Sequence, residues 1–308
     1  MVIERVRRPS LETVPLAHGK RARLYRMLYE HGPGHGTMLA LPVDQGLEHG
    51  PVDFLPNPSS ERPEFQIRMA IEGRYSAIAF HYGIAARYLP AHAGQIPLIL
   101  KLNGKTDIPP PDRAFSGLTG TVEDAVRLGA DAVGYTLYVG SPRQDEDFAQ
   151  LTRVRAECDR TGMPLVVWSY PRGEAIEKKG GRDSLYAVDY AARAAAELGA
   201  DVIKLNVPTF DQKAKDGSPK PYNEMVLEYR AAVEKVVRSA GQSFVLFSGG
   251  SKVGDADLIE KARLVMDAGA TGLIFGRNMW QRPMADALRL TEEIKRVMLG
   301  TRERASGS

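Results

Sequence analysis

The sequence predicts an α/β protein built as a single (β/α)8 barrel, the TIM-barrel architecture, with an N-terminal helical extension. Three segments (121–136, 187–206 and 258–277) share one pattern: an amphipathic helix, then Gly-Ala, then a short apolar run. About eight such apolar runs occur along the 308-residue chain, and helical patterns separate most of them. Strands that alternate with helices imply a parallel sheet, and eight repeats at this chain length favour closure into a barrel.

The apolar runs are too short for helices, and those behind the Gly-Ala pairs are rich in Val and Ile, as buried parallel strands are. Glycines at positions 129, 199 and 269 suit the left-handed conformation that closes a helix. The predicted strands are Met38–Val43, Ser76–Phe80, Pro97–Leu102, Asp131–Thr136, Pro164–Tyr170, Asp201–Asn206, Ser243–Phe247 and Thr271–Phe275.

An open, doubly wound sheet is the alternative arrangement of the same elements. Its dinucleotide fingerprint, G-x-G-x-x-G, would directly follow the first strand. The glycine-rich stretch GPGHGT, residues 32–37, precedes the first predicted strand instead. We therefore favour the barrel.

The chain divides into an N-terminal helical extension (1–32), a (β/α)8 barrel (33–300) and a flexible tail (301–308). Within the extension, LYRMLYEHG indicates a short helix that ends at Gly32 and covers the floor of the barrel. Two long loops, EHGPVDFLPNPSSERP and NGKTDIPPPDRAFSG, follow the first and third strands. Barrel enzymes place their chemistry at these strand ends.

Composition narrows the classes of partner. Hydrophobic residues make up 43% of the chain and charged residues 26%, and the net charge is only +3. Without a dense Lys/Arg tract, we expect no nucleic acid and no membrane surface as a partner. No apolar run approaches the ~20 residues of a membrane helix, and no signal-peptide core is present. The single cysteine, Cys158, fits a reducing cytoplasm.

Lys204 lies inside a short apolar run, ADVIKLN. Because side chains alternate along a strand, outward packing of Ile203 and Leu205 would point Lys204 into the barrel near its top. Desolvation can bring a lysine pKa from ~10.4 to ~7–8, and the neutral amine can then form a Schiff base with a ketone or aldehyde. The alternative is an ion-paired lysine. Lys101, at the end of the third strand, is a rival that strand parity does not exclude.

Glycine-rich ends follow the last two strands. SGGS, residues 248–251, follows the seventh strand, and FGRN, residues 275–278, includes the end of the eighth. Glycines let backbone N–H groups approach an anion, and Arg277 adds a forked cation. These two loops form the usual phosphate site of a barrel. The sequence therefore predicts phosphate binding by these two loops.

Other side chains at strand ends could support this chemistry. Tyr170 and Trp168 share the presumed inner face of the fifth strand, where a phenol could relay protons, although aromatic residues more often pack in cores. Asp44, after the first strand, could orient hydroxyl groups or hold a lysine charged. Alternatively, four polar residues could form a metal-binding cluster instead of contacting a substrate: His49, Glu48, Asp53 and His81. No metal-ligand spacing supports it, so we expect no metal.

Five motifs in order resemble the archaeal-type class I fructose-bisphosphate aldolases. They are VDQGLEHGP (43–51), VVWSYPRG (166–173), ADVIKL (200–205), SGG (248–250) and GRNMWQR (276–282). The resemblance implies that Lys204 forms the Schiff base, that Tyr170 donates protons and that Asp44 contacts the substrate. We expect Asp44 to be a catalytic residue as well, because it and Tyr170 are the two candidates to take the C4 hydroxyl proton. The resemblance also implies substrate contacts by Gln45, His49, Asp53, Trp168 and Arg172, to which we add Lys101. It implies phosphate contacts by Ser248, Gly249, Gly250, Gly276 and Arg277.

The implied reaction is reversible cleavage of fructose 1,6-bisphosphate to dihydroxyacetone phosphate and glyceraldehyde 3-phosphate. It needs no cofactor, and family members commonly form homo-oligomers. The chain departs from archaeal members after Lys204, where it continues LNVPTFDQKAKDGSPKPYN. A sister Schiff-base aldolase or transferase, or a non-catalytic sugar-phosphate-binding barrel, therefore remains an alternative.

Overall fold

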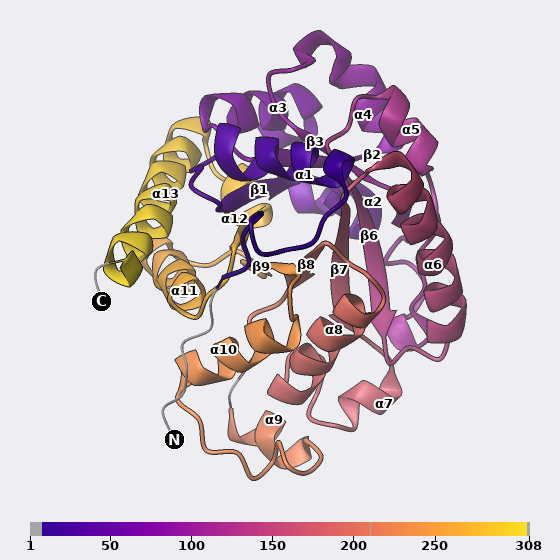
Figure 1. The fold of residues 1–308 in the computed structure, drawn as a ribbon, viewed down its shortest axis with the longest axis vertical. Helices are drawn as coiled ribbons and strands as arrows, with labels where there is room; N and C mark the ends of the chain where they lie inside the picture. Colours follow the sequence, from indigo (N-terminus) through magenta and orange to yellow (C-terminus); the bar gives the residue numbers. More distant parts are fainter. Residues whose placement is uncertain (1–7, 210, 307–308) are drawn as a thin grey trace.

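The computed structural model describes residues 8–209 and 211–306, and eight of its strands close into a parallel barrel (Figure 1). The strand order around the barrel is β1-β10-β9-β8-β7-β6-β3-β2, which confirms the predicted closed barrel over the open sheet. The barrel strands are β1 (Met38–Pro42), β2 (Ala77–His81), β3 (Leu98–Lys101), β6 (Ala132–Val139), β7 (Leu165–Pro171), β8 (Val202–Leu205), β9 (Phe244–Ser248) and β10 (Gly272–Ile274).

Helices surround this barrel as an outer layer (Figure 1). They include α3 (Pro63–Glu72), α4 (Tyr82–Tyr88), α5 (Val122–Arg127), α6 (Gln144–Thr161), α8 (Leu185–Glu197), α10 (Tyr229–Ser239), α11 (Asp255–Asp267) and α13 (Met284–Ser306). The last of them thus continues through residues 301–306, which the sequence assigned to the tail.

Short elements lie in the connecting loops. They are α2 (Gln45–Glu48), η2 (Pro51–Phe54), η3 (Pro58–Glu61), η4 (Pro90–His92), η5 (Pro111–Arg113), α7 (Glu174–Glu177), α9 (Gln212–Gly217) and α12 (Arg277–Trp280). A two-stranded sheet, β4 (Asn103–Gly104) with β5 (Gly117–Leu118), sits in the loop after β3. The sequence did not predict this small sheet.

Alternation along β8 explains where its side chains go. Ile203 and Leu205 pack in the outer apolar cluster with the helices, whereas Val202 packs in the inner cluster with Val166 and Trp168. Lys204 therefore faces the barrel interior, as predicted from strand parity.

The N-terminal extension closes the floor of the barrel. It comprises α1 (His18–Tyr25) and a π-helical turn, η1 (Arg26–Glu30), and α1 lies across the barrel in Figure 1. Apolar residues of this segment, among them Leu24 and Met27, belong to the inner cluster. Lys20 pairs with Asp201 at 2.8 Å, just before β8. The extension thus packs against the amino-terminal ends of the barrel strands.

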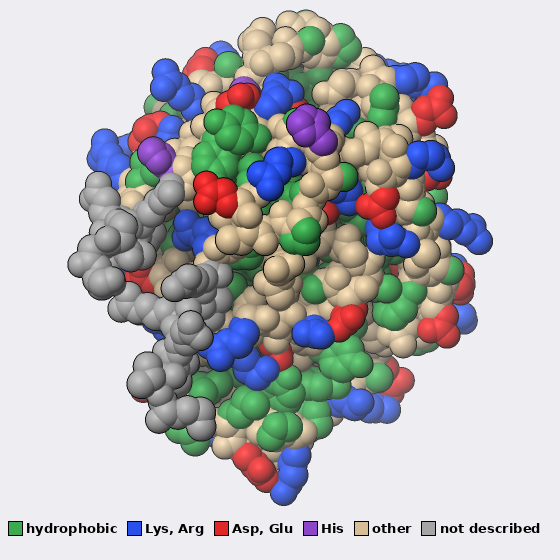
Figure 2. Space-filling view, viewed as in Figure 1, with side chains coloured by type: hydrophobic (Ala, Val, Ile, Leu, Met, Phe, Trp, Pro, Cys, Tyr) green, Lys and Arg blue, Asp and Glu red, His purple; other side chains and the backbone are tan. Residues whose placement is uncertain are grey.

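The surface carries mixed charge. On the face shown in Figure 2, lysine and arginine side chains are interspersed with aspartate and glutamate. None of the helices in the described ranges combines the length and apolar character needed to cross a bilayer.

Candidate active site

A cavity of about 1050 Å³ opens at the carboxyl ends of the barrel strands. Thirteen of the fourteen predicted site residues line it, and Lys101 is the exception. The thirteen are Asp44, Gln45, His49, Asp53, Trp168, Tyr170, Arg172, Lys204, Ser248, Gly249, Gly250, Gly276 and Arg277. Segments far apart in the sequence thus converge because the barrel closes.

Lys204 is the buried lysine of this cavity, with only 6% of its surface exposed. It pairs in register with Trp168 of β7, and its Nζ donates a hydrogen bond to the Tyr170 hydroxyl. Burial lowers the pKa of Lys204 to about 8; the charges of Asp44 and Glu48 oppose this shift, and the positive charges of Lys101 and Arg277 favour it. Near physiological pH, a much larger fraction of Lys204 is therefore neutral than of an ordinary lysine.

Lys101 is in the opposite electrostatic state. Its side chain is fully buried, and its Nζ donates to Glu48 Oε1 at 2.6 Å and to Asp44 Oδ2 at 3.2 Å. Burial favours the neutral amine, but the charges of Glu48 and then Asp44 outweigh it and raise the pKa of Lys101 above its usual value. Lys101 therefore stays charged, and the structure separates the two lysines that strand parity left equivalent.

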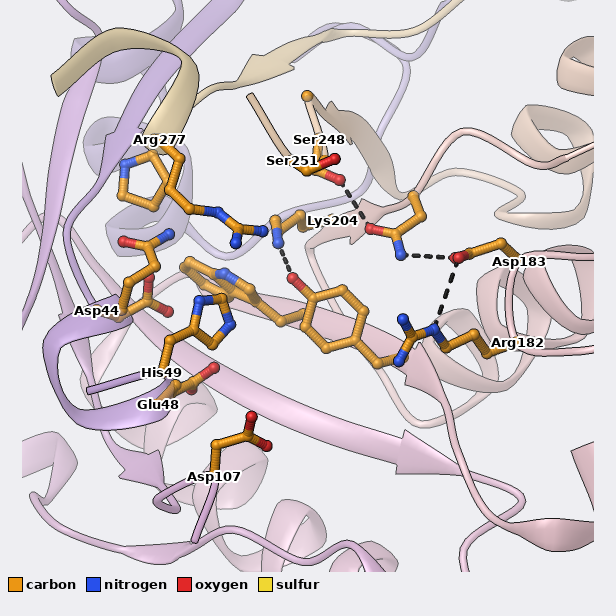
Figure 3. A pocket seen from close by; sticks show the side chains of 18 of the residues that line it. Asp44, Glu48, His49, Asp107, Arg182, Asp183, Lys204, Ser248, Ser251 and Arg277 are labelled. Atoms are coloured by element: carbon orange, nitrogen blue, oxygen red, sulfur yellow. Dashed lines mark hydrogen bonds and ion pairs between the residues drawn. The ribbon is translucent and has the colours of Figure 1, made fainter. Parts of the chain in front are cut away.

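Asp44 and Glu48 belong to the loop after β1. Burial would raise the pKa of Asp44, but the ammonium groups of Lys101 and then Lys204 hold it below its usual value. Glu48 Oε1 also accepts a hydrogen bond from Thr136 Oγ1 at 3.3 Å. Figure 3 shows both carboxylates beside His49 on one wall of the cavity. Ionised carboxylates here can only accept hydrogen bonds.

The loops after β9 and β10 form a concave anion cradle, defined here as Ser248–Gly250 with Gly276 and Arg277. A Cβ on Gly249 would lie 2.6 Å from Asn278 Nδ2, and one on Gly276 would lie 2.9 Å from the Pro42 carbonyl oxygen. A side chain at Gly249 would thus crowd the loop after β10, and one at Gly276 would crowd the end of β1. Lys261, from α11, lines the cavity and donates to the Gly249 carbonyl at 3.2 Å.

His49 and Asp53 form a second polar group near Arg277. His49 Nδ1 lies 2.7 Å from Asp53 Oδ2, and Arg277 Nε lies 3.9 Å from the same oxygen. The hypothetical metal cluster does not assemble around them, because Glu48 pairs with Lys101 instead. Among the described residues, no three His, Cys, Asp or Glu side chains are grouped to hold a metal ion.

Sequence reasoning missed a hydrogen-bonded chain across the cavity. Ser248 Oγ donates to Asn206 Oδ1 at 2.8 Å, and Asn206 Nδ2 donates to Asp183 Oδ1 at 2.8 Å. Arg182 follows, with its Nε 3.7 Å from Asp183 Oδ2. The sequence could have indicated Asn206, because it lies two residues after Lys204 and shares its face of the predicted strand. Arg182 and Asp183 lie between α7 and α8, away from any strand end, so no pattern marked them.

Comparison with known proteins places this site in a family. Residues 38–282 match the DeoC/LacD family aldolase. The class 1 fructose-bisphosphate aldolase of Thermoproteus tenax is 38% identical over 271 residues, covering 88% of this chain and 92% of the relative. The 2-amino-3,7-dideoxy-D-threo-hept-6-ulosonate synthase of Halobacterium salinarum is 32% identical over 270 residues, 88% of each chain.

A solved structure is also similar. It is an archaeal fructose-1,6-bisphosphate aldolase whose catalytic lysine is covalently bound to the carbinolamine intermediate of the substrate. The two share 36% identity and a TM-score of 0.76, over 90% of this chain and 98% of that one. The extent of the family match and the identity to these relatives show that the chain belongs to the DeoC/LacD family of aldolases.

Proposed function

We propose that this protein is a class I aldolase that reversibly cleaves fructose 1,6-bisphosphate into dihydroxyacetone phosphate and glyceraldehyde 3-phosphate. The family and the activities named for its relatives support this reaction. The observation that carries the mechanism is one buried lysine, Lys204, whose pKa is lowered to about 8 and whose amine contacts a phenol.

Lys204 begins the reaction as a nucleophile. At pH 7, a pKa of about 8 leaves about one amine in ten neutral, several hundredfold more than for an unperturbed lysine. The neutral amine attacks the C2 ketone and gives a carbinolamine. Because Tyr170 contacts Nζ, its hydroxyl can donate the proton that lets the C2 hydroxyl leave as water.

The resulting iminium withdraws electrons from the neighbouring carbon. A base removes the C4 hydroxyl proton, the C3–C4 bond breaks, and its electron pair forms an enamine while the aldehyde leaves. Tyr170 and Asp44 both line the cavity and are the two candidates for this base. Protonation at C3 and hydrolysis of the imine then release dihydroxyacetone phosphate and regenerate the amine.

The anion cradle fixes which end of the ketose meets Lys204. β9 is paired with β8, so Ser248–Gly250 lie beside the lysine strand, and we place the 1-phosphate there with Arg277. Gln45, His49, Asp53, Trp168 and Arg172 line the remaining cavity as substrate contacts. Lys101 has no cavity surface, so we assign it to positioning Asp44 and Glu48 and not to contacting substrate.

Borohydride reduction in the presence of dihydroxyacetone phosphate tests the proposal. The reduced adduct should appear on the peptide that contains Lys204, and cleavage of fructose 1,6-bisphosphate should be measurable by a coupled assay. Lys101 serves as an internal control, because its paired ammonium cannot attack a carbonyl. An adduct on Lys101, or no adduct at all, would contradict the mechanism.

A sister aldolase or transferase is the second candidate, because a ulosonate synthase is 32% identical to this chain. Such an enzyme would keep the lysine adduct but use another carbon–carbon partner. A panel of aldehyde acceptors separates the two: an adduct without cleavage of fructose 1,6-bisphosphate favours the sister reaction. For the protein as a whole we propose a cytoplasmic homo-oligomer, as is common in the family, which sedimentation would test.

A further inference from the structure

Two further cations, Arg172 and Arg182, line the end of the cavity opposite the anion cradle. In Figure 3, Arg277 and Arg182 lie on opposite sides of Lys204. A ketose with an anionic group at each end could therefore hold its carbonyl near Lys204 while both ends meet a guanidinium.

Arg172 is held rigidly at this end. Its guanidinium lies 5.1 Å from the Tyr170 ring centroid and 5.9 Å from that of Tyr138, and its Nη1 donates to the Pro171 carbonyl at 2.8 Å. Burial and then the charge of Arg182 lower the pKa of Arg172. Two cations that repel each other in a cleft favour the binding of an anion between or beside them.

Arg182 is available for such an anion. Its side chain is 56% exposed, and within the described residues its charged partner is Asp183, at 3.7 Å, a separation too long for a hydrogen bond. Asp183 is itself anchored through Asn206 to Ser248 of the anion cradle. Asn206 lies two residues after Lys204. These hydrogen bonds therefore connect Asp183, the neighbour of Arg182, to the anion cradle and to the end of the strand that carries the reacting lysine.

We infer that Arg182, positioned by Asp183 and acting with Arg172, binds the phosphate on the aldehyde half of the substrate and makes the enzyme select phosphorylated aldehydes. The inference rests on the proposed aldolase function. A phosphate suits this end because guanidinium groups bind its oxygens in a forked, charge-assisted geometry. Asp183 is negatively charged and would repel a phosphate directly, so we assign it the positioning of Arg182 through their ion pair at 3.7 Å.

A comparison of two ketoses tests the inference: fructose 1,6-bisphosphate, which carries the second phosphate, and fructose 1-phosphate, which lacks it. In Arg182→Gln, the ratio of kcat/KM for the bisphosphate to that for the monophosphate should fall by on the order of 10- to 100-fold, mainly through KM for the bisphosphate. Arg182→Lys should retain an intermediate ratio, because it keeps the charge without the fork. Arg193→Gln is the matched control: Arg193 is exposed on α8, pairs with Glu197 and does not line the cavity.

The outcomes separate the inference from the function it rests on. If the unmodified enzyme cleaves both ketoses and Arg182→Gln leaves the ratio as in Arg193→Gln, the inference fails while the aldolase function stands. If the unmodified enzyme cleaves neither ketose, the proposed function fails and the inference falls with it.

Discussion

Replacing Lys101 with methionine tests the electrostatic account of the site directly. The substitution keeps the length of the side chain but removes the charge that pairs with Asp44 and Glu48. That charge also lowers the pKa of Lys204. We therefore expect Lys101→Met to raise the pKa of Lys204 and to lower kcat/KM at neutral pH, although Lys101 does not line the cavity.

The distances to one aromatic ring set the size of the effect. The Nζ atoms of Lys101 and Lys204 lie 5.1 Å and 5.9 Å from the Trp168 ring centroid, which places them no more than the sum of these distances apart. At a separation of about 11 Å and an effective dielectric constant of about 20, two unit charges repel by about 1.5 kcal/mol, or about one pKa unit. Asp44 and Glu48, freed from Lys101, act in the same direction.

The assay is the pH dependence of kcat/KM between about pH 6 and about pH 10, whose acid limb reports the pKa of the free enzyme. The midpoint should lie near pH 8 in the unmodified enzyme and at about pH 9 or higher in Lys101→Met. The rate at pH 7 should then fall about tenfold or more from this cause alone, and the deficit should shrink as pH rises.

Lys20→Met is the matched control. Lys20 is also buried and ion-paired, with Asp201 and Asp159 at 2.8 Å each, but it lies at the floor of the barrel. Both variants should lose stability, by up to about 3–5 kcal/mol where the buried carboxylate is left uncompensated. Only Lys101→Met should move the acid limb. A folded Lys101→Met enzyme whose midpoint stays at that of Lys20→Met would refute the reasoning.

Three further substitutions follow from the same contacts. Lys204→Met should abolish turnover and raise the free energy of unfolding by up to about 3 kcal/mol at pH 7. The lysine amine keeps its proton to about pH 10.5 in the unfolded chain but only to about pH 8 in the folded protein, so the cost of burying its charge is complete below pH 8 and gone above pH 10.5. Urea titrations should therefore show the gain in stability at about pH 7 and not at about pH 11. Tyr170→Phe should slow turnover and let the imine accumulate, seen as more borohydride-trapped adduct during turnover; an unaltered rate would remove Tyr170 from the mechanism. Gly134→Ala should destabilise the fold by about 1–3 kcal/mol, because the new Cβ would meet Trp168 at 2.7 Å and Lys101 at 3.0 Å; an unchanged thermal midpoint would show that these side chains can move away.

The barrel could be predicted because its evidence is local. Short Val- and Ile-rich runs, each behind a helix and a glycine, recur along the chain, and strand parity then fixes which side chains point inward. Lys204 and the anion cradle follow from that periodicity and from their positions at strand ends. The boundaries were less accurate: β6 continues to Val139, three residues beyond the predicted strand, and β8 is shorter at both ends.

The charge states of the two lysines could not be predicted, because they depend on partners distant in sequence. Asp44 lies 57 residues from Lys101, and only the pairing of β1, β2 and β3 brings the loop after β1 next to the end of β3. Arg182 and Asp183 were missed for a related reason. They follow the short helix α7, and Asp183 accepts a hydrogen bond from Asn206 at the cavity, a contact that no periodic pattern encodes.

The spacing of the two carboxylates decides which lysine reacts. Asp44 and Glu48 are four residues apart across the single turn of α2, a spacing that places both side chains on one face. Both therefore reach Lys101, and Lys204 is left with a phenol, whose hydrogen bond does not require a charged amine. Had one carboxylate paired with Lys204 instead, its attraction would have offset the burial that lowers the lysine pKa. The ion pair at Lys101 thus keeps negative charge in the site without neutralising the effect of burial on the nucleophile.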